Sequence, residues 1–244
     1  MHSFGETRSR NRRDHLLQTP DTFVRTSLPG IERGTVVVHV SPGMGSGFTQ
    51  YTAELESGGA MTAATAQRFV YVLSGSIDVA APTGFHTLEP GGYAYIPAEL
   101  DCGVTARKET RLAVIEKPYE PLAGVTAPTL LVGDESAIAS TALNGDEDLQ
   151  VRNLLPDAPA FDFAVNTMTY QPGASLNQVE IHIMEHGLLM LEGGGIYRLN
   201  DDWYPVKAGD FIWMAPYCPQ WFGALGKAPA KYLIYKDCNR HPLG

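Results

Sequence analysis

Two copies of one sequence pattern, offset by 118 residues, dominate this chain of 244 residues. Gly75 in the first copy corresponds to Gly193 in the second, and Gly91 corresponds to Gly209. Similar apolar runs lie directly before Gly75 and Gly193. A repeat of this length predicts two similar folding units in tandem, because each copy carries its own set of apolar residues to bury.

Both copies have the pattern of β-strands. Runs rich in β-branched and aromatic residues, such as Thr35–Val40 and Phe211–Met214, alternate with turns that contain glycine or proline. The 25 glycines and 17 prolines are spread along the chain, which predicts an all-β protein. We expect an N-terminal arm over residues 1–30 that packs across a neighbouring sheet or subunit, a first β unit over 31–124, a linker over 125–150 and a second β unit over 151–240.

The charge and cysteine content argue against some kinds of partner. The formal net charge is −9, which disfavours a surface for the phosphates of nucleic acid. No apolar run approaches the length of a membrane span, so we expect no membrane partner. The three cysteines are few and widely spaced, which is not typical of a disulfide framework and favours the reducing cytoplasm.

One short stretch in the second copy carries the strongest chemical signal. Glu180, His182 and His186 all occupy even positions, and even positions share one face of an extended strand. Ile181 and Ile183 would then point to the opposite face, toward an apolar core. A lone histidine in a β-barrel is usually a satisfied polar residue, but three metal-capable side chains on one face predict a metal site.

Neither Glu185 nor the first copy is expected to contribute a metal ligand. Glu185 is odd-numbered, so an unbroken strand turns it away from the metal, and we expect it to be structural or to support a ligand. The first copy holds Thr62, Ala64 and Arg68 at the positions that correspond to the three candidate ligands. None of these is a useful ligand, so we expect the first copy to be without metal.

The spacing of the candidate ligands resembles the cupin signature. In that signature two ligands one residue apart precede a third ligand and then a glycine, as Glu180, His182, His186 and Gly193 do here. The second cupin motif begins at a glycine and ends eleven residues later in a fourth ligand, which here is Gln220. The resemblance implies a bicupin: two tandem jelly-roll barrels, with the metal site in the second barrel only. The position in the first barrel that corresponds to Gln220 is Cys102, which we expect to be a small buried apolar residue.

Longer motifs narrow the resemblance further. Thr19-Pro20-Asp21, Ser41–Gly45, Glu89–Tyr93, the ligand stretch and Tyr235–Arg240 together resemble the (S)-ureidoglycine aminohydrolase family over nearly the whole chain. The resemblance implies a hydrolase of purine catabolism. It would replace the amino group of (S)-ureidoglycine with water, giving (S)-ureidoglycolate and ammonia during allantoin degradation.

The four candidate ligands also indicate which kind of metal ion the site would bind. Two imidazole nitrogens and two oxygen ligands with one formal negative charge suit a hard or borderline divalent ion in octahedral geometry. The family resemblance implies Mn²⁺, one ion per chain, and other divalent metals remain open. Tetrahedral Zn²⁺ fits less well, because four protein ligands would leave it no position for substrate.

Further residues are candidates for binding and catalysis. Lys236 could hold the substrate carboxylate, and Tyr197 could donate a hydrogen bond from the strand that follows the ligand hairpin. Tyr232 lies on the same strand face as Lys236, and Gln220 could also contact substrate. Glu180 could use its second oxygen to accept a proton from the amine. We therefore expect Glu180, Lys236 and Tyr197 to be the catalytic set.

Two other functions are compatible with a cupin sequence. One is another metal-dependent cupin enzyme, a dioxygenase or decarboxylase, although most of those are expected to carry histidine where this chain has Gln220. The other is a binding module without catalysis, which would more commonly have lost its ligands. In each case the ligand is a small molecule. Because cupin barrels commonly pair through their sheets, we expect a homo-oligomer.

Overall fold

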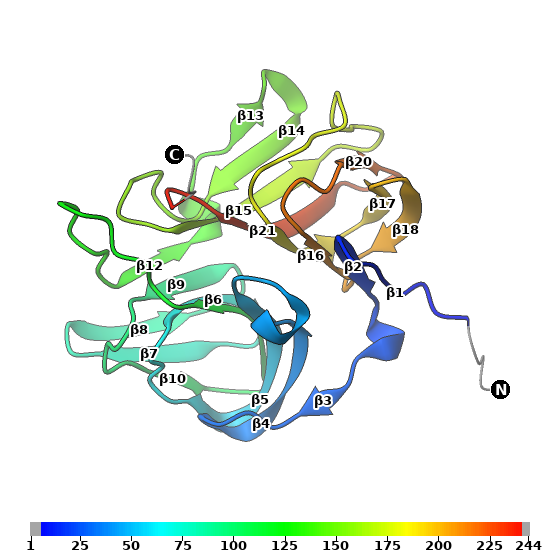
Figure 1. The fold of residues 1–244 in the computed structure, drawn as a ribbon. Helices are drawn as coiled ribbons and strands as arrows, with labels where there is room; N and C mark the ends of the chain where they lie inside the picture. The colour runs from blue at the N-terminus through cyan, green and yellow to red at the C-terminus, as the bar shows by residue number, and fades with distance from the viewer. Residues whose placement is uncertain (1–5, 241–244) are drawn as a thin grey trace. The chain divides into compact units, whose positions relative to one another are not determined.

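The computed structural model describes residues 6–240, a range that contains strands and three short 3₁₀ turns but no α-helix. The predicted all-β fold class is therefore confirmed. Two compact units make up the chain (Figure 1). The first barrel comprises residues 24–138 and 158–162, and the second barrel comprises residues up to 23, 139–157 and 163 onward. Within the described range there is accordingly no helix long and apolar enough to cross a membrane.

The first barrel is built on one ten-stranded antiparallel sheet. Its strands are β3 (Arg25–Thr26), β4 (Ile31–Val40), β5 (Thr49–Met61), β6 (Gln67–Ser74), β7 (Ile77–Ala81), β8 (Gly84–Leu88), β9 (Gly92–Ile96), β10 (Gly103–Ala106), β11 (Thr110–Lys117) and β12 (Leu131–Asp134). The long strand β5 pairs with β4, β10 and β11. Its odd-numbered side chains Tyr51, Ala53 and Leu55 are buried in an aliphatic core, as the alternation of a β-strand requires.

The second barrel contains an eight-stranded sheet, in the order β1-β2-β19-β16-β21-β15-β14-β13, and a three-stranded sheet, β18-β17-β20. The strands are β1 (Arg10–Asn11), β2 (His15–Gln18), β13 (Thr141–Leu143), β14 (Asp146–Asn153), β15 (Phe163–Tyr170), β16 (His186–Glu192), β17 (Gly194–Leu199), β18 (Asp202–Lys207), β19 (Phe211–Met214), β20 (Gln220–Ala224) and β21 (Ala230–Asp237). Aromatic side chains form the centre of its core, where Phe222 packs edge to face against both Tyr170 and Tyr232.

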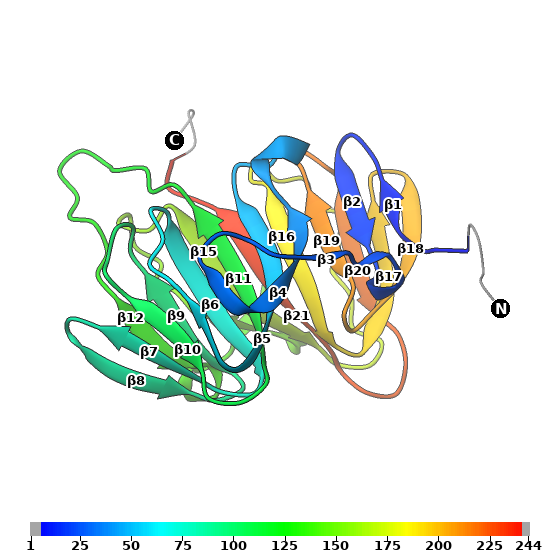
Figure 2. The same cartoon turned by 90° about the horizontal axis from the view of Figure 1, so that it is seen from below.

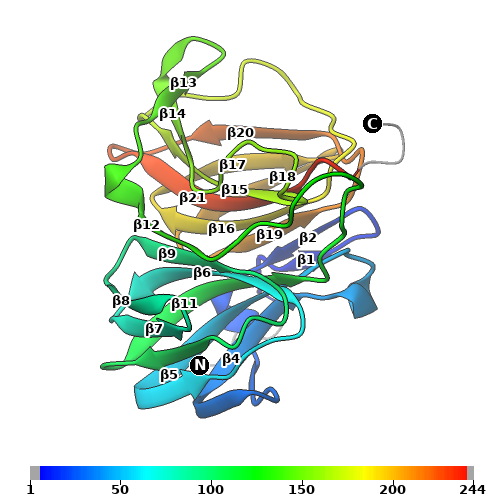
Figure 3. The same cartoon turned by 90° about the vertical axis from the view of Figure 1, so that its left-hand side faces the viewer.

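Residues 6–30 and 125–150 do not stand apart from the two units. Strand β2 joins the eight-stranded sheet of the second barrel by pairing with β19, and β3 joins the first barrel (Figure 2). The segment predicted as a linker supplies β12 to the first barrel, and it supplies β13 and the first half of β14 to the second. The β13–β14 hairpin forms one end of the eight-stranded sheet (Figure 3). Residues 1–5 of the predicted arm lie outside the described residues.

The repeated glycines have a steric cause. Gly75 and Gly193 each follow the central strand of a barrel and adopt left-handed φ angles of 88° and 63°. A Cβ atom at Gly75 would collide with the main chain of Glu109, and one at Gly193 would collide with the main chain of Pro229. Only glycine fits this tight turn, so the same residue recurs in both copies.

Candidate metal and active site

A cavity of about 120 Å³ lies in the second barrel. It is lined by all seven residues that the sequence singled out for metal, substrate or catalysis, namely Glu180, His182, His186, Tyr197, Gln220, Tyr232 and Lys236. The rest of the lining is apolar and consists of Leu143, Met168, Leu176 and Ile234. Polar and apolar walls in one small cavity are typical of a binding site for a small, polar molecule.

The candidate ligands meet by a route that differs from the predicted strand. Residues 181–185 are not in a strand, and β16 begins only at His186. Glu180 instead forms an isolated bridge with Gln220, through hydrogen bonds of 2.8 and 2.9 Å between their main chains. The prediction that Ile181 and Ile183 face the core is therefore wrong, and their side chains are 62% and 41% exposed. Strand alternation does not apply to them because the chain bends between the bridge and β16.

Two histidines and a carboxylate lie together on one side of the cavity. Nε2 of His182 is 3.0 Å from Oε2 of Glu180, and the rings of His182 and His186 stack with centroids 5.1 Å apart. His186 is buried at the start of β16. Burial, helped by the nearby charge of Lys236 and by His182, lowers the pKa of His186 to about 3. Its imidazole is therefore neutral, which is the form that binds metal ions.

Two tyrosines and a glutamine in the cavity lining are buried. The Tyr197 hydroxyl donates to Oε1 of Gln220 at 3.4 Å, and the Tyr232 hydroxyl is 2.7 Å from that of Tyr170. Burial holds the pKa of Tyr197 and of Tyr232 well above the ordinary phenol value. Both phenols therefore stay neutral and can donate or accept hydrogen bonds to a ligand.

Lys236 supplies the cation of the cavity. It lies on β21, directly opposite His186 in the pairing of β16 with β21. Burial lowers the pKa of Lys236, whereas the charge of Glu180 opposes that shift. Among residues 6–240 its ammonium group makes no hydrogen bond or ion pair. It is therefore available to an anionic group of a ligand.

Glu185 lies outside the cavity lining. Its carboxylate accepts a hydrogen bond of 3.0 Å from Nε1 of Trp213. Its main-chain nitrogen donates to Oδ1 of Asp237 at 2.6 Å. Glu185 directly precedes β16, and its contacts with Trp213 and Asp237 are structural.

Sequence reasoning missed two features of the second barrel. Leu143, which lines the cavity, comes from the segment predicted as a linker, although the Asn144-Gly145 turn that follows it is a local hairpin signal. In addition, ligand-type atoms of Asp14, His15 and Cys218 lie within 4.8 Å of one another, a possible metal site. That group depends on the pairing of β2 with β19, which brings together segments about 200 residues apart and leaves no signal in the sequence.

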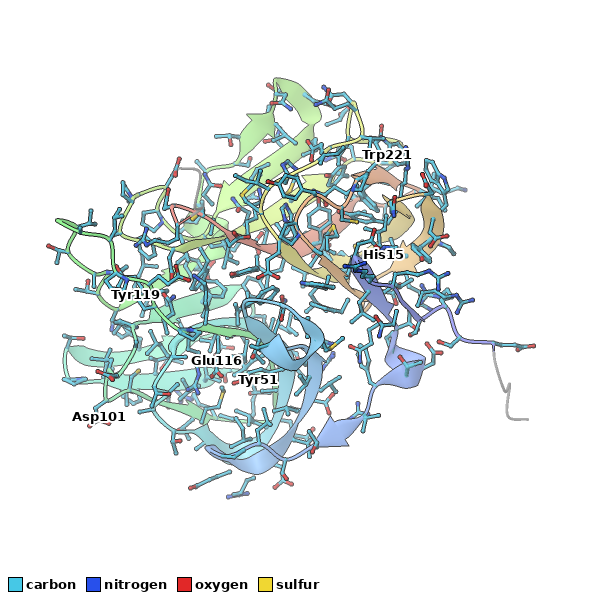
Figure 4. All side chains as sticks on the ribbon, viewed as in Figure 1. His15, Tyr51, Asp101, Glu116, Tyr119 and Trp221 are labelled. Atoms are coloured by element: carbon cyan, nitrogen blue, oxygen red, sulfur yellow. The ribbon has the colours of Figure 1, made fainter. Side chains whose placement is uncertain are left out.

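The positions that correspond to the site in the first barrel contain an ion pair. Nε of Arg68 donates to Oε1 of Glu116 at 2.6 Å, and the Tyr51 hydroxyl donates to the same oxygen at 3.0 Å (Figure 4). A second guanidinium nitrogen of Arg68 donates to the main-chain oxygen of Thr62 at 2.8 Å. The acceptors and donors of this cluster satisfy one another.

Each barrel matches a family model. Residues 42–119 match the EutQ-like cupin domain, and residues 166–235 match the cupin domain. The chain is therefore a bicupin, as its sequence motifs predicted.

Relatives that match 98% of this chain show which family of bicupins it belongs to. The chain is 43% identical to the "Probable (S)-ureidoglycine aminohydrolase" of Oryza sativa subsp. japonica, over 98% of this chain and 78% of that protein. It is 40% identical to the (S)-ureidoglycine aminohydrolase of Arabidopsis thaliana, over 98% of this chain and 80% of that one. The crystal structure of protein Ylba from E. coli superposes with a TM-score of 0.86 at 29% identity, covering 97% of this chain and 96% of the other. The chain belongs to the (S)-ureidoglycine aminohydrolase family.

Proposed function

We propose that the cavity of the second barrel is the active site of a ureidoglycine aminohydrolase and that its seven polar residues bind metal, bind substrate and transfer protons. Family membership supports the reaction: (S)-ureidoglycine and water give (S)-ureidoglycolate and ammonia in purine catabolism. One observation supports the location. Lys236, which forms no ion pair within residues 6–240, shares a cavity of about 120 Å³ with two imidazoles and a carboxylate.

The donor set fits a divalent metal ion. Glu180, His182, His186 and Gln220 would hold one Mn²⁺ ion, because two nitrogen and two oxygen donors match the preference of such an ion. His182 and Glu180 already face each other at 3.0 Å, and His186 is neutral. When bound, Mn²⁺ would anchor the substrate and act as a Lewis acid on it. The identity of the metal is part of this proposal.

The remaining residues would orient a substrate with three polar substituents on one carbon. Lys236 would bind the carboxylate, and this charge-assisted contact would fix one end of the molecule. Tyr197, Tyr232 and Gln220 offer neutral donors and acceptors that suit the ureido group. The apolar wall would exclude bulk water from the reacting carbon.

The reaction requires a proton transfer, and Glu180 would carry it out. In the net reaction the bond from the α-carbon to the amino nitrogen breaks and a bond to the oxygen of water forms. One proton of that water must reach the departing ammonia. Glu180 is the carboxylate of the cavity, and an oxygen that is not engaged elsewhere could accept this proton and pass it on.

An assay of ammonia release tests the proposed function. Purified protein and freshly made (S)-ureidoglycine are incubated with Mn²⁺, with EDTA, and with EDTA followed by Mn²⁺. We expect ammonia release that EDTA abolishes and Mn²⁺ restores, with no oxygen uptake. Oxygen consumption would indicate a cupin dioxygenase instead. Ammonia from allantoate but not from ureidoglycine would place the enzyme at a different step.

Two further properties belong to this proposal. We expect a homo-oligomer, and the exposed apolar side chains of Ile181 and Ile183 support such an association. We also expect a cytoplasmic protein, which is consistent with three cysteines that form no disulfide. Light scattering would measure the oligomer, and fractionation of cells would locate the protein.

A further inference from the structure

The N-terminal strand β2 runs beside the strand that leads toward Gln220 (Figure 2). His15 pairs with the last residue of β19. The main-chain oxygen of Asp14 accepts a hydrogen bond of 2.9 Å from the nitrogen of Ala215, so the pairing continues into the turn after β19. This turn, residues 215–219, is called the Gln220 turn because Gln220 follows it directly.

Side chains extend the connection to the far end of the turn. Oδ2 of Asp14 accepts from Nδ2 of Asn200 at 2.8 Å. The main-chain nitrogen of Asn200 donates to the oxygen of Pro219 at 2.7 Å, and Pro219 precedes Gln220. Oδ1 of Asp14 lies 2.9 Å from Nδ1 of His15, which keeps the carboxylate in place. Asp14 therefore holds both ends of the Gln220 turn, one directly and one through Asn200.

The opposite side of the turn is bonded to the segment that carries the other candidate ligands. The nitrogen of Tyr217 donates to the oxygen of His182 at 2.6 Å. The main chains of Gln220 and Glu180 exchange two hydrogen bonds, of 2.9 and 2.8 Å. A shift of the Gln220 turn would consequently move Gln220, Glu180 and His182 together.

A metal centre is the competing explanation for this cluster, since Asp14, His15 and Cys218 have ligand atoms within 4.8 Å of one another. The contacts of His15, whose position Figure 4 labels, argue against it. The Tyr204 hydroxyl donates to Oδ2 of Asp202 at 3.1 Å and lies 2.9 Å from Nε2 of His15. Nδ1 of His15 faces the carboxylate of Asp14, which can only accept. Both ring nitrogens of His15 therefore already face a partner side chain, and a metal ion could bind His15 only by displacing one of these contacts.

We propose that Asp14 and His15 are positioning residues: they fix the Gln220 turn and thereby hold Gln220, Glu180 and His182 in the arrangement that binds metal and substrate. The N-terminal strand is then part of the active-site scaffold rather than a separate arm. This inference rests on the proposed function, because it requires that the cavity be the active site.

The test compares three variants of the full chain with the wild type. Asp14→Ala removes the acceptor for Asn200 and His15, whereas Asp14→Asn keeps an oxygen that Asn200 can bond. Arg8→Gln is the matched control, because Arg8 ties the same N-terminal segment to Asp210 at 2.5 and 2.8 Å without contacting the Gln220 turn. The measurements are the number and affinity of bound Mn²⁺ ions, by calorimetry and elemental analysis, and kcat and KM for ureidoglycine.

We expect Asp14→Ala to bind Mn²⁺ about tenfold more weakly and to lose kcat to a similar extent, because residues that orient ligands typically contribute about 10–100-fold. Asp14→Asn should recover most of both losses. Arg8→Gln should keep wild-type metal affinity even if its thermal stability falls. A purely structural role for Asp14 would instead give equal losses in Asp14→Ala and Arg8→Gln and would overturn the inference.

Other outcomes separate the remaining explanations. Wild-type metal affinity in Asp14→Ala would also refute the positioning role. Two metal ions per wild-type chain, with one lost in both Asp14→Ala and Cys218→Ser, would show a metal centre instead. Glu180→Ala is measured in parallel. If Glu180→Ala keeps its metal and its turnover, the proposed function fails; if only Glu180→Ala is impaired, the positioning inference alone fails.

Discussion

The two barrels place different chemistry at matching points of the same scaffold. In the first barrel Arg68 on β6 pairs with Glu116 on β11, and in the second His186 on β16 pairs with Lys236 on β21. Arg68 and Glu116 bond to each other at 2.6 Å, so their charges are neutralised internally. His186 and Lys236 do not form an ion pair, and both line a cavity.

This difference shows that one fold can hold either a satisfied ion pair or a ligand-accessible pair of polar groups at the same point. An ion pair with its hydrogen bonds made has little left to offer a ligand. A neutral imidazole beside a buried ammonium group destabilises the folded state, because burial disfavours the charged form of each side chain. Such local costs are expected where a protein binds a ligand that supplies the missing partner. Under the proposed function, the second barrel would carry the chemistry and the first would support the chain.

The largest effect is expected when the second barrel is converted to the chemistry of the first. His186→Arg combined with Lys236→Glu would place an ion pair in the cavity. We expect no measurable Mn²⁺ binding and no ammonia release above the blank, with unchanged β-sheet content by circular dichroism. Lys227→Gln, which lowers the net charge by one at an exposed position just as the double variant does, is the control and should stay active. Turnover in the double variant would refute the assignment of the cavity.

A smaller effect is expected when only the cation of the cavity is removed. Lys236→Met should lower kcat/KM for ureidoglycine about 10–100-fold, mainly through KM, because a hydrogen bond to a charged group contributes about 1.5–3 kcal/mol. The variant should resist urea at least as well as the wild type, since burial already disfavours the ammonium form. Steady-state kinetics and urea unfolding measure both. An unchanged KM would remove Lys236 from the substrate site.

The corresponding change in the first barrel should affect stability and leave catalysis intact. Arg68→Met leaves the carboxylate of Glu116, 23% exposed, without its cation. We expect the free energy of unfolding to fall by about 2 kcal/mol, less than the roughly 3–5 kcal/mol typical of fully buried pairs. Adding Glu116→Leu should recover part of this loss. The kcat should equal that of the wild type, and a large drop in kcat would contradict a purely supporting role for the first barrel.

The smallest effect concerns a buried histidine of the first barrel. Nε2 of His39 lies 2.8 Å from the Thr52 hydroxyl, and burial, with a smaller effect of Arg111, lowers the pKa of His39 to about 3. Below its unfolded-state pKa of about 6.5, the unfolded chain binds a proton that the folded chain does not. Stability is therefore lost as the pH falls from about 6.5 toward 3, by about 1.4 kcal/mol per pH unit for this group.

His39→Gln tests this pH dependence. The variant should lose stability less steeply than the wild type between pH 6 and pH 4.5, and it should bind Mn²⁺ normally. Urea unfolding at several pH values measures the slope. Equal slopes would show that His39 does not titrate as its burial indicates.

Much of the fold was predictable, because the repeated glycines and alternating apolar runs have direct steric and packing causes. Gly75 and Gly193 occupy a turn that excludes any Cβ, and this made the repeat visible. The grouping of Glu180 with His182 and His186 was predicted from strand alternation, yet it arises from a bridge to Gln220 and a bend. Spacing can therefore be informative even where the assumed geometry is wrong.

The unpredicted parts depend on contacts between distant segments. Leu143 reaches the cavity because the β13–β14 hairpin continues the sheet of the second barrel. Asp14 reaches the Gln220 turn because β2 pairs with β19. The Asn144-Gly145 turn is a local signal for the β13–β14 hairpin, but no local pattern predicts which sheet the hairpin extends or that β2 pairs with β19.

The most direct test of the account is ammonia release by the Glu180→Gln variant. The wild type should convert freshly made ureidoglycine to ammonia in the presence of Mn²⁺. Glu180→Gln keeps the size of the side chain but removes its charge and its capacity as a base. We predict a loss of about 10²–10⁴-fold, the usual contribution of a proton-transfer group, in a protein with an unchanged fold. Full turnover in this variant would contradict the assignment of the second barrel as a catalytic centre built around Glu180.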